Sequence, residues 1–572
     1  MNSDATPDSP AHTPDSSLDR RGFLTRSLAA ALTGAGAAIG AGATGGAEAL
    51  ANEIDPHSRL TRANLAYRVR CKAALLARRD QPAPHPNNGD EELYPSRIAN
   101  FSKGLPHNSI GEVDADAYNL FLHALHNGHP DEFEAIPMGA QSPNVQRKLV
   151  NPQSALAFEL EGDDSHALAI PPAPAFASHE AAGEIVENYW MALTRDVSFL
   201  DYGSDATALA AAQDLSNLPD FRGPKLAGQV TSQTLFRNSL PGATTGPYLS
   251  QFLWLPVPFG ANYVEQQMRT AVAGLDYLTT YGEWLSTQRG EAPVLTQQYD
   301  STRRYIRNGR DLGQWVHVDV LFQAYFHAML ILLAAPDASD DNSNGLGCPF
   351  DPGNPYAASL NQTGFGTFGG PHIAALMCEV ATRALKAVWF QKWCVHRRLR
   401  PEAFGGRVHN VLAGLASYPL ALADLQNSQA LARVYNLHGN YLLPMAYPEG
   451  SPLHPAYGAG HATVAGACVT ILKAWFDESF VIPDPVVPTP DGLALTSYSG
   501  PDLTVGGELN KLASNVAMGR NFAGVHWRSD ATESFKLGEA IAISVLRDQR
   551  LTFNEHFQGF TLTKFDGTTI TV

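Results

Sequence analysis

Apolar side chains recur every three or four positions through residues 373–393, IAALMCEVATRALKAVWFQKW, which is the spacing of one face of an α-helix. The same spacing runs through 179–193, where Ser178 is placed to cap the helix start. Further helices are predicted at about residues 59–78, 258–285, 311–334, 461–476, 506–519 and 528–547. Since few stretches alternate strictly between apolar and polar residues, we predict a mainly α fold of helical bundles joined by long irregular loops.

Two long connections interrupt the helical pattern. Residues 336–370 and 481–505 are rich in proline, glycine and aspartate. Loops of this length are uncommon in a compact domain and often frame a functional site. Because no obvious linker divides the chain, we predict a single domain over residues 52–572. In that domain an N-terminal region at 52–240 would wrap a helical core at 365–550, which would hold the site.

The first 51 residues resemble an export signal. The arginine pair Arg20 and Arg21 lies in DRRGFLTR, which precedes an apolar stretch at 28–50 rich in alanine and glycine and ending in small residues. This pattern favours the twin-arginine route to the periplasm or the extracellular space. A disordered basic tail is the alternative. The apolar segment 321–335 is too short to span a membrane, so we predict a buried helix there.

The net charge restricts the possible partners. The whole chain has a formal net charge of −16, and residues 52–572 have 37 Lys and Arg against 51 Asp and Glu, a net charge of −14. An acidic surface argues against nucleic acid and against an anionic membrane as partners. A small anion remains a possible ligand wherever cations are concentrated locally.

Five cysteines are few for an exported chain of this length, and no CxxC spacing is present. Neither a disulfide scaffold nor a zinc site is therefore indicated. We predict that Cys378, Cys394 and Cys468, which lie in apolar helical patterns, are buried as small hydrophobic residues. The odd number leaves at least one thiol unpaired within the chain.

Cations gather in KWCVHRRLRPEAFGGR, residues 392–407. Lys392 lies at the end of the predicted helix 373–393, and Arg400 precedes Pro401, where the helix must have ended. Five cations between these two positions, with His396 included, would repel one another unless carboxylates or a bound anion compensate them. An exposed basic helix end, which the helix dipole favours, is the alternative.

Two further stretches contain histidine beside features that could bind an anion. In HPAYGAGHA, residues 454–462, small residues run directly into an apolar helix, so backbone N–H groups near Gly460 and His461 are free to approach an anion. In GRNFAGVHWRSDATES, residues 519–534, Asp530 follows His526 by one helical turn and can accept its second ring N–H. The alternatives are a structural histidine and a helix-capping aspartate.

The three motifs occur in a fixed order, which is K and RP, then GH, then R-x5-H-x3-D. This order closely resembles the signature shared by vanadium-dependent haloperoxidases and by bacterial and lipid acid phosphatases. Seven residues separate Lys392 from Arg400, where the phosphatase form has six, and this spacing resembles the bromoperoxidase branch. The stretches VHRRLRPEAFGG and NPQSALAFELEG also resemble red-algal bromoperoxidases and their bacterial relatives. The resemblance covers nearly the whole chain after the export signal.

The resemblance implies a vanadate site. His526 would coordinate vanadium, with Asp530 accepting its second ring N–H. The vanadate oxygens would be bound by Lys392, Arg400, Arg520 and the Gly460 amide. His461 would hydrogen-bond the apical oxygen and move the proton that peroxide loses, and His454 would lie near the same oxygens. One departure concerns Ala459, where the family usually has serine, so that one hydroxyl contact to vanadate is absent.

Three functions follow from such a site. The resemblance implies a vanadate-dependent peroxidase that oxidises halide, bromide above all, with hydrogen peroxide to hypohalous acid. An acid phosphatase with His526 as nucleophile and His461 as acid is the alternative, since trigonal-bipyramidal vanadate resembles the transition state of phosphoryl transfer. A non-catalytic oxyanion binder is the third. Related enzymes are homo-oligomers, so assembly is expected here too.

Overall fold

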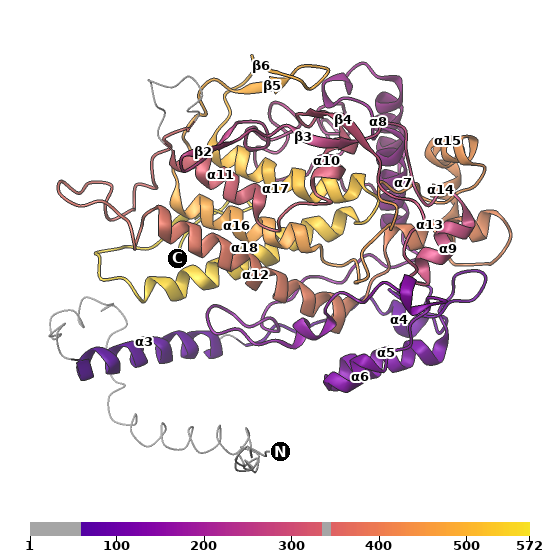
Figure 1. The fold of residues 1–572 in the computed structure, drawn as a ribbon, viewed down its shortest axis with the longest axis horizontal. Coiled ribbons are helices and arrows are strands. Elements are labelled where there is room, and N and C mark those ends of the chain that lie inside the picture. Colours follow the sequence, from indigo (N-terminus) through magenta and orange to yellow (C-terminus); the bar gives the residue numbers. More distant parts are fainter. Residues whose placement is uncertain (1–58, 80, 335–344) are drawn as a thin grey trace, which may run out of the picture. The chain divides into compact units, whose positions relative to one another are not determined.

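Long helices dominate the computed structural model, which describes residues 59–79, 81–334 and 345–572 (Figure 1). Its α-helices are α3 (Arg59–Arg79), α4 (Asp90–Leu93), α5 (Ala115–Asn127), α6 (Pro130–Glu134), α7 (His179–Leu193), α8 (Ala206–Asn217), α9 (Tyr281–Gln288), α10 (Gly309–Trp315), α11 (Gln323–Leu333), α12 (Gly370–Phe390), α13 (Pro401–Leu412), α14 (Leu422–Asn427), α15 (Gln429–His438), α16 (Gly460–Trp475), α17 (Val505–Phe522) and α18 (Arg528–Arg550). Single-turn 3-10 helices are η1 (Pro143–Val145), η2 (Pro152–Leu156), η3 (Phe199–Asp201) and η4 (Gln251–Leu253), and η5 (Gln391–His396) is a π-helix.

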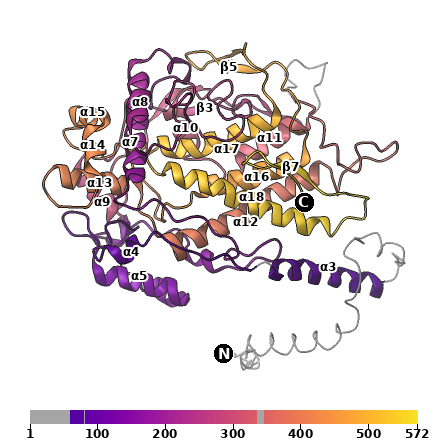
Figure 2. The same cartoon turned by 180° about the vertical axis from the view of Figure 1, so that it is seen from behind.

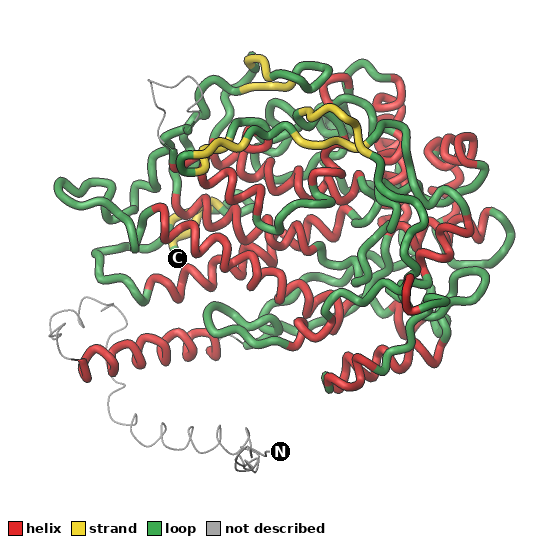
Figure 3. Tube along the Cα trace, viewed as in Figure 1, coloured by secondary structure: helices red, strands yellow, loops and turns green. Residues whose placement is uncertain are grey.

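Strands are short and peripheral in the part of the chain that the structure describes (Figure 3). They are β1 (Val257–Phe259), β2 (Asn262–Val264), β3 (Met268–Ala271), β4 (Tyr299–Arg304), β5 (Val486–Pro488), β6 (Leu495–Ser497), β7 (Thr561–Thr563) and β8 (Thr569–Thr571). They form the antiparallel pairs β1–β2, β3–β4, β5–β6 and β7–β8, in which Val257 faces Val264, Met268 faces Arg304, Val486 faces Ser497 and Thr561 faces Thr571. The predicted mainly α fold is confirmed.

Most of the predicted helices are present with nearly the predicted bounds. The periodic stretch 373–393 forms α12 and continues into η5, so Lys392 lies in a π-helical turn and not at the end of a regular helix. π-Helical turns inside α-helices are rare and occur often at functional sites. The Ser178 side chain accepts a hydrogen bond of 3.1 Å from the Ala181 N–H at the start of α7, as predicted.

Two helix predictions were wrong. Residues 258–285 contain β1, β2, β3 and only the start of α9, because turns with positive φ at Gly260 and Gly274 divide an apolar pattern that short strands also satisfy. The predicted helix 311–334 is divided into α10 and α11 by a non-helical segment at 316–322. This segment supplies side-chain and backbone groups to the site described below.

The centre of the molecule is α16, in which every residue except His461 is buried. A helix that is apolar on all sides needs neighbours on all sides, and α12, α17 and α18 pack against it (Figure 2). Glycines allow close approach to α18, since a Cβ at Gly538 would lie 2.0 Å from the Thr463 carbonyl oxygen, and one at Gly466 2.3 Å from that of Phe535. This contact fixes the starts of α16 and α18 beside each other.

N-terminal residues are bound to this core, and Pro56–Val572 form one compact unit. The Phe101 N–H donates to the Arg397 carbonyl oxygen at 2.7 Å, and Asn100 and Arg398 form an isolated β-bridge. The finer division into a wrapping region and a core stays a prediction, and the predicted export signal lies outside the described residues. No helix among those described is long and apolar enough to cross a membrane.

The five cysteines are all free thiols and all lie in described segments. The prediction of burial is correct for Cys468 and wrong for Cys378 and Cys394, which are half-buried; Cys348 is buried instead. Helical periodicity places Cys378 and Cys394 at the edge of an apolar face, where their burial depends on what covers that face.

We expect Gly538→Ala to destabilise the fold, because the added methyl group meets the α16 backbone. Overpacking of a close contact costs about 1–3 kcal/mol, which differential scanning calorimetry would record as a lower Tm. Gly282→Ala in α9 is the matched control, since a Cβ there has nothing within 4 Å. Equal Tm values for the two variants would contradict the close-approach argument.

Candidate active site

Five of the predicted site residues lie together where α13, α16 and α18 begin and α17 ends. They are Lys392, Arg400, His454, Arg520 and His526. Arg400 is the central member. Its Nη1 lies 3.0 Å from His526 Nε2, its Nη2 2.9 Å from His454 Nδ1, and its Nε donates to the His454 carbonyl oxygen at 2.9 Å. Lys392 and Arg520 lie close enough to act electrostatically on Arg400 and on both histidines.

The Trp389 indole, in the last turn of α12, forms one side of this cluster. Its ring centroid lies 4.7 Å from that of His454 and 5.8 Å from the Lys392 ammonium. A Cβ at Gly460 would lie 3.2 Å from the same ring, which places the start of α16 against it. Trp389 is not among the predicted site residues, because the pattern of residues 373–393 predicts only a helix.

The cations between 392 and 400 divide into two groups by their partners. Arg397 forms an ion pair with Glu91, and Arg398 contacts Glu184 at 2.8 Å and Asp530 at 3.2 Å. Lys392 and Arg400 form no ion pair with any described carboxylate. The Lys392 ammonium donates only to the carbonyl oxygens of two residues, Pro455 and Ala456, at 2.8 Å.

Arg520 belongs to the group without carboxylate partners. Its Nη1 donates to the Val316 carbonyl oxygen at 2.8 Å, and its buried Nε has no hydrogen-bond partner among the described residues. Three buried cations therefore meet without a compensating carboxylate beside them, although Asp530 lies within electrostatic range. A bound acceptor would satisfy this guanidinium N–H, since buried polar groups are usually hydrogen-bonded.

This environment opposes positive charge. Burial, reinforced by the Arg400 guanidinium, holds the pKa of Lys392 well below its ordinary value. Burial also lowers the pKa of Arg400 to about 9. The pKa values of His526 and His454 are lowered by burial, then by Arg400 and Lys392. A bound anion would reverse these shifts, because an opposite charge favours the protonated cations.

His526 is held by a chain of buried contacts. Its Nδ1 lies 2.7 Å from Asp530 Oδ2, and the same carboxylate accepts from the Trp527 N–H at the start of α18. Because an ionised carboxylate only accepts, Nδ1 carries the proton and Nε2 presents its lone pair to the cations. Burial raises the pKa of Asp530 to about 6, and Arg398, itself paired with Glu184, opposes that rise.

The start of α16 lacks a side-chain cap. Ala459 occupies the N-cap position, where it offers no acceptor to the first N–H groups of the helix. Its own N–H donates to Ser534 Oγ at 2.8 Å. The amide of Gly460 at the first position of α16 is consequently available to a bound anion, and its contact to vanadate stays a prediction.

His461 lies at the more exposed edge of the site. Its side chain is 19% exposed, and its Nε2 lies 3.0 Å from Asp319 Oδ1. Asp319 is not among the predicted site residues, because the sequence pattern predicts a single helix over 311–334. One signal was available, since Asp319 is the only charged residue between positions 312 and 336.

No group of three or more His, Cys, Asp or Glu side chains in the described segments could hold a metal ion. The arrangement is instead one histidine lone pair surrounded by cations and a helix N-terminus. Such a donor set suits a tetrahedral oxyanion whose central atom accepts a nitrogen ligand.

Comparison with known proteins identifies the family of the chain. A family model described as the VCPO second helical-bundle domain matches residues 426–555. The vanadium-dependent bromoperoxidase of Corallina pilulifera is 38% identical, over 90% of this chain and 98% of the relative. The chain belongs to the vanadium-dependent bromoperoxidase family. The vanadium-dependent bromoperoxidase of Ascophyllum nodosum is 35% identical over 83% of this chain and 91% of its own.

A solved structure of this family has the same fold. The homohexameric second vanadate-dependent bromoperoxidase of Ascophyllum nodosum superimposes with a TM-score of 0.83 at 32% identity, over 90% of this chain and 91% of that one. The chain's own residues fit vanadate, since buried cations, an unpaired Arg520 Nε and the His526 lone pair converge at the start of α16. The roles assigned to individual site residues stay predictions.

We expect oxyanion binding to be accompanied by proton uptake, because an anion raises the depressed pKa of Lys392. Sulfate is a suitable probe, since it does not titrate near neutral pH. Calorimetric titration between pH 7 and 9, in buffers of different ionisation enthalpy, counts the protons. The Lys392→Met variant should take up fewer protons when sulfate binds. Proton release by the parent protein would contradict the electrostatic argument.

We also expect Ala459→Ser to tighten vanadate binding. The hydroxyl would supply the contact that the family usually has, and one such hydrogen bond is worth about 1.4 kcal/mol, or about tenfold in Kd. Equilibrium dialysis measures the change. Ala413→Ser, at the exposed end of α13, is the control. An unchanged or weaker affinity would show that Ala459 does not face the anion.

Proposed function

We propose that this chain oxidises halide, bromide above all, with hydrogen peroxide, using vanadate bound at the start of α16. The observation that carries the proposal is the meeting of Lys392, Arg400 and Arg520, buried without ion-pair partners, around the Nε2 lone pair of His526. A cluster of this kind is costly to bury unless an anion occupies it.

When bound, vanadate supplies a Lewis acid that activates hydrogen peroxide toward halide. The chain's residues bind it, position it and move protons. Lys392, Arg400 and Arg520 would neutralise the oxygens, the Gly460 N–H would bind one of them, and His526 would provide the nitrogen ligand. Preorganised cations in a dry site also stabilise the negative charge that develops as the O–O bond breaks.

Proton transfer is assigned to His461. Peroxide must lose protons when it binds, and His461 combines solvent access with a hydrogen bond to Asp319, which orients its ring. His454 is less suited, because it is buried and its ring nitrogens face the Arg400 guanidinium and the Pro455 carbonyl oxygen. We therefore place His454 in a supporting contact to Arg400.

The acid phosphatase alternative would use the same groups, with His526 as nucleophile and His461 as acid. It is not favoured, because relatives named as bromoperoxidases align with nearly the whole chain. A non-catalytic oxyanion binder would need only the cations and the helix start.

Bromination of a phenol dye separates the three functions. We expect activity that requires vanadate, peroxide and bromide together, and His526→Ala should lower it at least about 100-fold with loss of vanadium by elemental analysis. His166→Ala, an exposed histidine, is the control for the substitution itself. Bromination by His526→Ala near the parent rate would refute the ligand assignment.

The other outcomes identify the other functions. Peroxide-independent hydrolysis of a phosphate ester, inhibited by vanadate, would indicate the phosphatase. Retained oxyanion binding with neither activity would indicate the binder.

We further propose that the chain assembles with copies of itself and is exported by the twin-arginine route. Assembly is supported by the homohexameric solved relative, and export by the Arg20 and Arg21 pair before an apolar segment. Arg20→Lys combined with Arg21→Lys should keep the protein in the cytoplasm, whereas Arg26→Lys should not. Cell fractionation and N-terminal sequencing of the exported form measure both. Normal export of the double variant would contradict the proposed route.

A further inference from the structure

Helix α3 has no buried residue. The side chains of Leu60, Tyr67 and Leu75 are 80%, 60% and 59% exposed. With Cys71 they are spaced seven, four and four positions apart, so they lie on one helix face. A helix without tertiary packing is only marginally stable in water. The exposed apolar face of α3 therefore indicates that another surface covers it.

The charge of α3 restricts that surface. The helix contains no acidic residue and seven basic ones, which are Arg59, Arg62, Arg68, Arg70, Lys72, Arg78 and Arg79. None of the seven forms an ion pair with a described residue. Like charges one turn apart, as at Arg68 and Lys72, destabilise a helix. A surface that stabilises α3 must therefore be both acidic and partly apolar.

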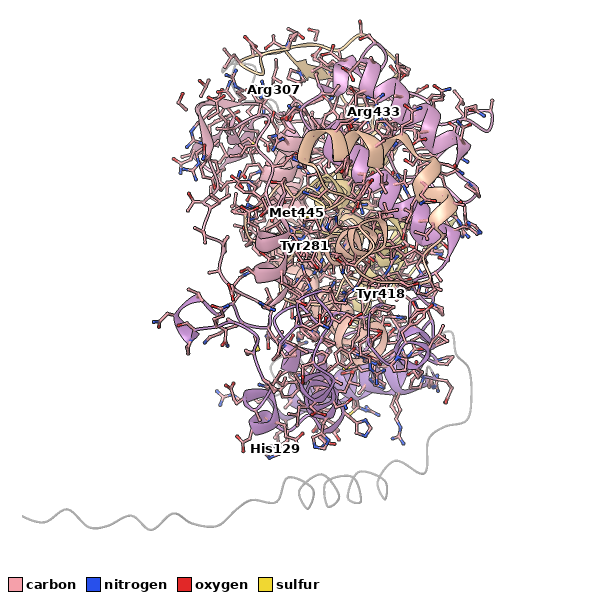
Figure 4. The ribbon with its side chains drawn as sticks, turned by 90° about the vertical axis from the view of Figure 1, so that its right-hand side faces the viewer. His129, Tyr281, Arg307, Tyr418, Arg433 and Met445 are labelled. Atoms are coloured by element: carbon pink, nitrogen blue, oxygen red, sulfur yellow. The ribbon has the colours of Figure 1, made fainter. Side chains whose placement is uncertain are left out.

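The surface formed by α5, α6 and the residues directly before α5, called here the α5–α6 surface, has that character. It contains six carboxylates, which are Glu112, Asp114, Asp116, Asp131, Glu132 and Glu134, and no lysine or arginine lies between Lys103 and Arg147. None of the six forms an ion pair with a described lysine or arginine. The outer face of α5 adds the exposed Leu120, one turn from Asp116. His129, which caps α6, lies at the outer edge of the molecule in Figure 4.

We propose that α3 of one copy of this chain docks on the α5–α6 surface of a second copy. The apolar face around Tyr67 would pack near Leu120, and the cations of α3 would face the six carboxylates. The inference rests on the assembly proposed above and is independent of the proposed reaction. Two copies can exchange this contact reciprocally, because each brings both surfaces.

An anionic membrane is the other surface that a basic helix with exposed apolar side chains can bind. The rest of the chain disfavours it. Residues 80–572 contain 49 Asp and Glu against 30 Lys and Arg, so the body that follows α3 would be repelled from an anionic surface. The same acidic excess attracts α3 of another copy.

Charge reversal tests the contact by light scattering after size exclusion at 0.15 M and 0.5 M NaCl. The α3 set is Arg62→Glu, Arg68→Glu and Arg70→Glu. The acidic set is Asp116→Lys, Asp131→Lys and Glu134→Lys. We expect the wild-type oligomer to lose at least half of its mass with either set alone, and to regain it when one chain carries both sets. Circular dichroism confirms that each variant is folded.

A control set alters the charge equally at exposed cations elsewhere, by Lys148→Glu, Lys225→Glu and Arg550→Glu, and should leave the mass unchanged. An unchanged mass for the α3 set, or failure of the combined sets to restore assembly, would overturn this docking surface. The wild type could also bind phosphatidylglycerol vesicles, and the α3 set could abolish that binding without changing the oligomer mass. This result would overturn the docking surface in favour of a membrane. A monomeric wild type would overturn the assembly proposal too, whereas bromination tests the reaction separately.

Discussion

Three buried cations without a carboxylate partner among the described residues set the conditions for the rest of the site. Lys392, Arg400 and Arg520 each donate hydrogen bonds to backbone carbonyl oxygens, which satisfy N–H groups but do not compensate charge. The cost of burying them appears as depressed pKa values at Lys392 and Arg400. Burial disfavours the charged form of these side chains, so a small bound anion would stabilise the site strongly. Selectivity for an oxyanion would therefore depend on burial as much as on geometry.

The carboxylates near the site form ion pairs with other arginines. Glu91 pairs with Arg397, and Glu184 pairs with Arg398, so that the two arginines adjacent to each other in sequence are compensated and Arg400 is not. Arg398 then contacts Asp530, which fixes the tautomer of His526. Glu91 and Glu184 therefore influence the site without belonging to it, because their ion pairs determine which cations remain uncompensated.

The sequence predicted the helices of the core well, because α16, α17 and α18 are long and their apolar spacing is uninterrupted. It failed at 258–285, where short strands satisfy the same spacing over a few residues. It identified Lys392, Arg400 and His526 as one site through the order of three motifs. Only the resemblance to the family separated Arg400 from Arg397 and Arg398, because the partners of the latter two, Glu91 and Glu184, lie more than 200 positions away in the sequence. Asp319 was missed for a related reason, because its role depends on a break between helices.

Two of the predicted site histidines contact an aspartate, and they differ in burial. His526 and His461 each have an aspartate within 3.0 Å, so hydrogen bonding alone does not distinguish them. His526 is buried among cations that keep it neutral, and it can offer a lone pair but cannot exchange protons with solvent. His461 lies at the exposed edge, beside the uncapped start of α16. The difference in burial therefore supports the proposed roles, in which His526 would be the nitrogen ligand and His461 would carry the proton.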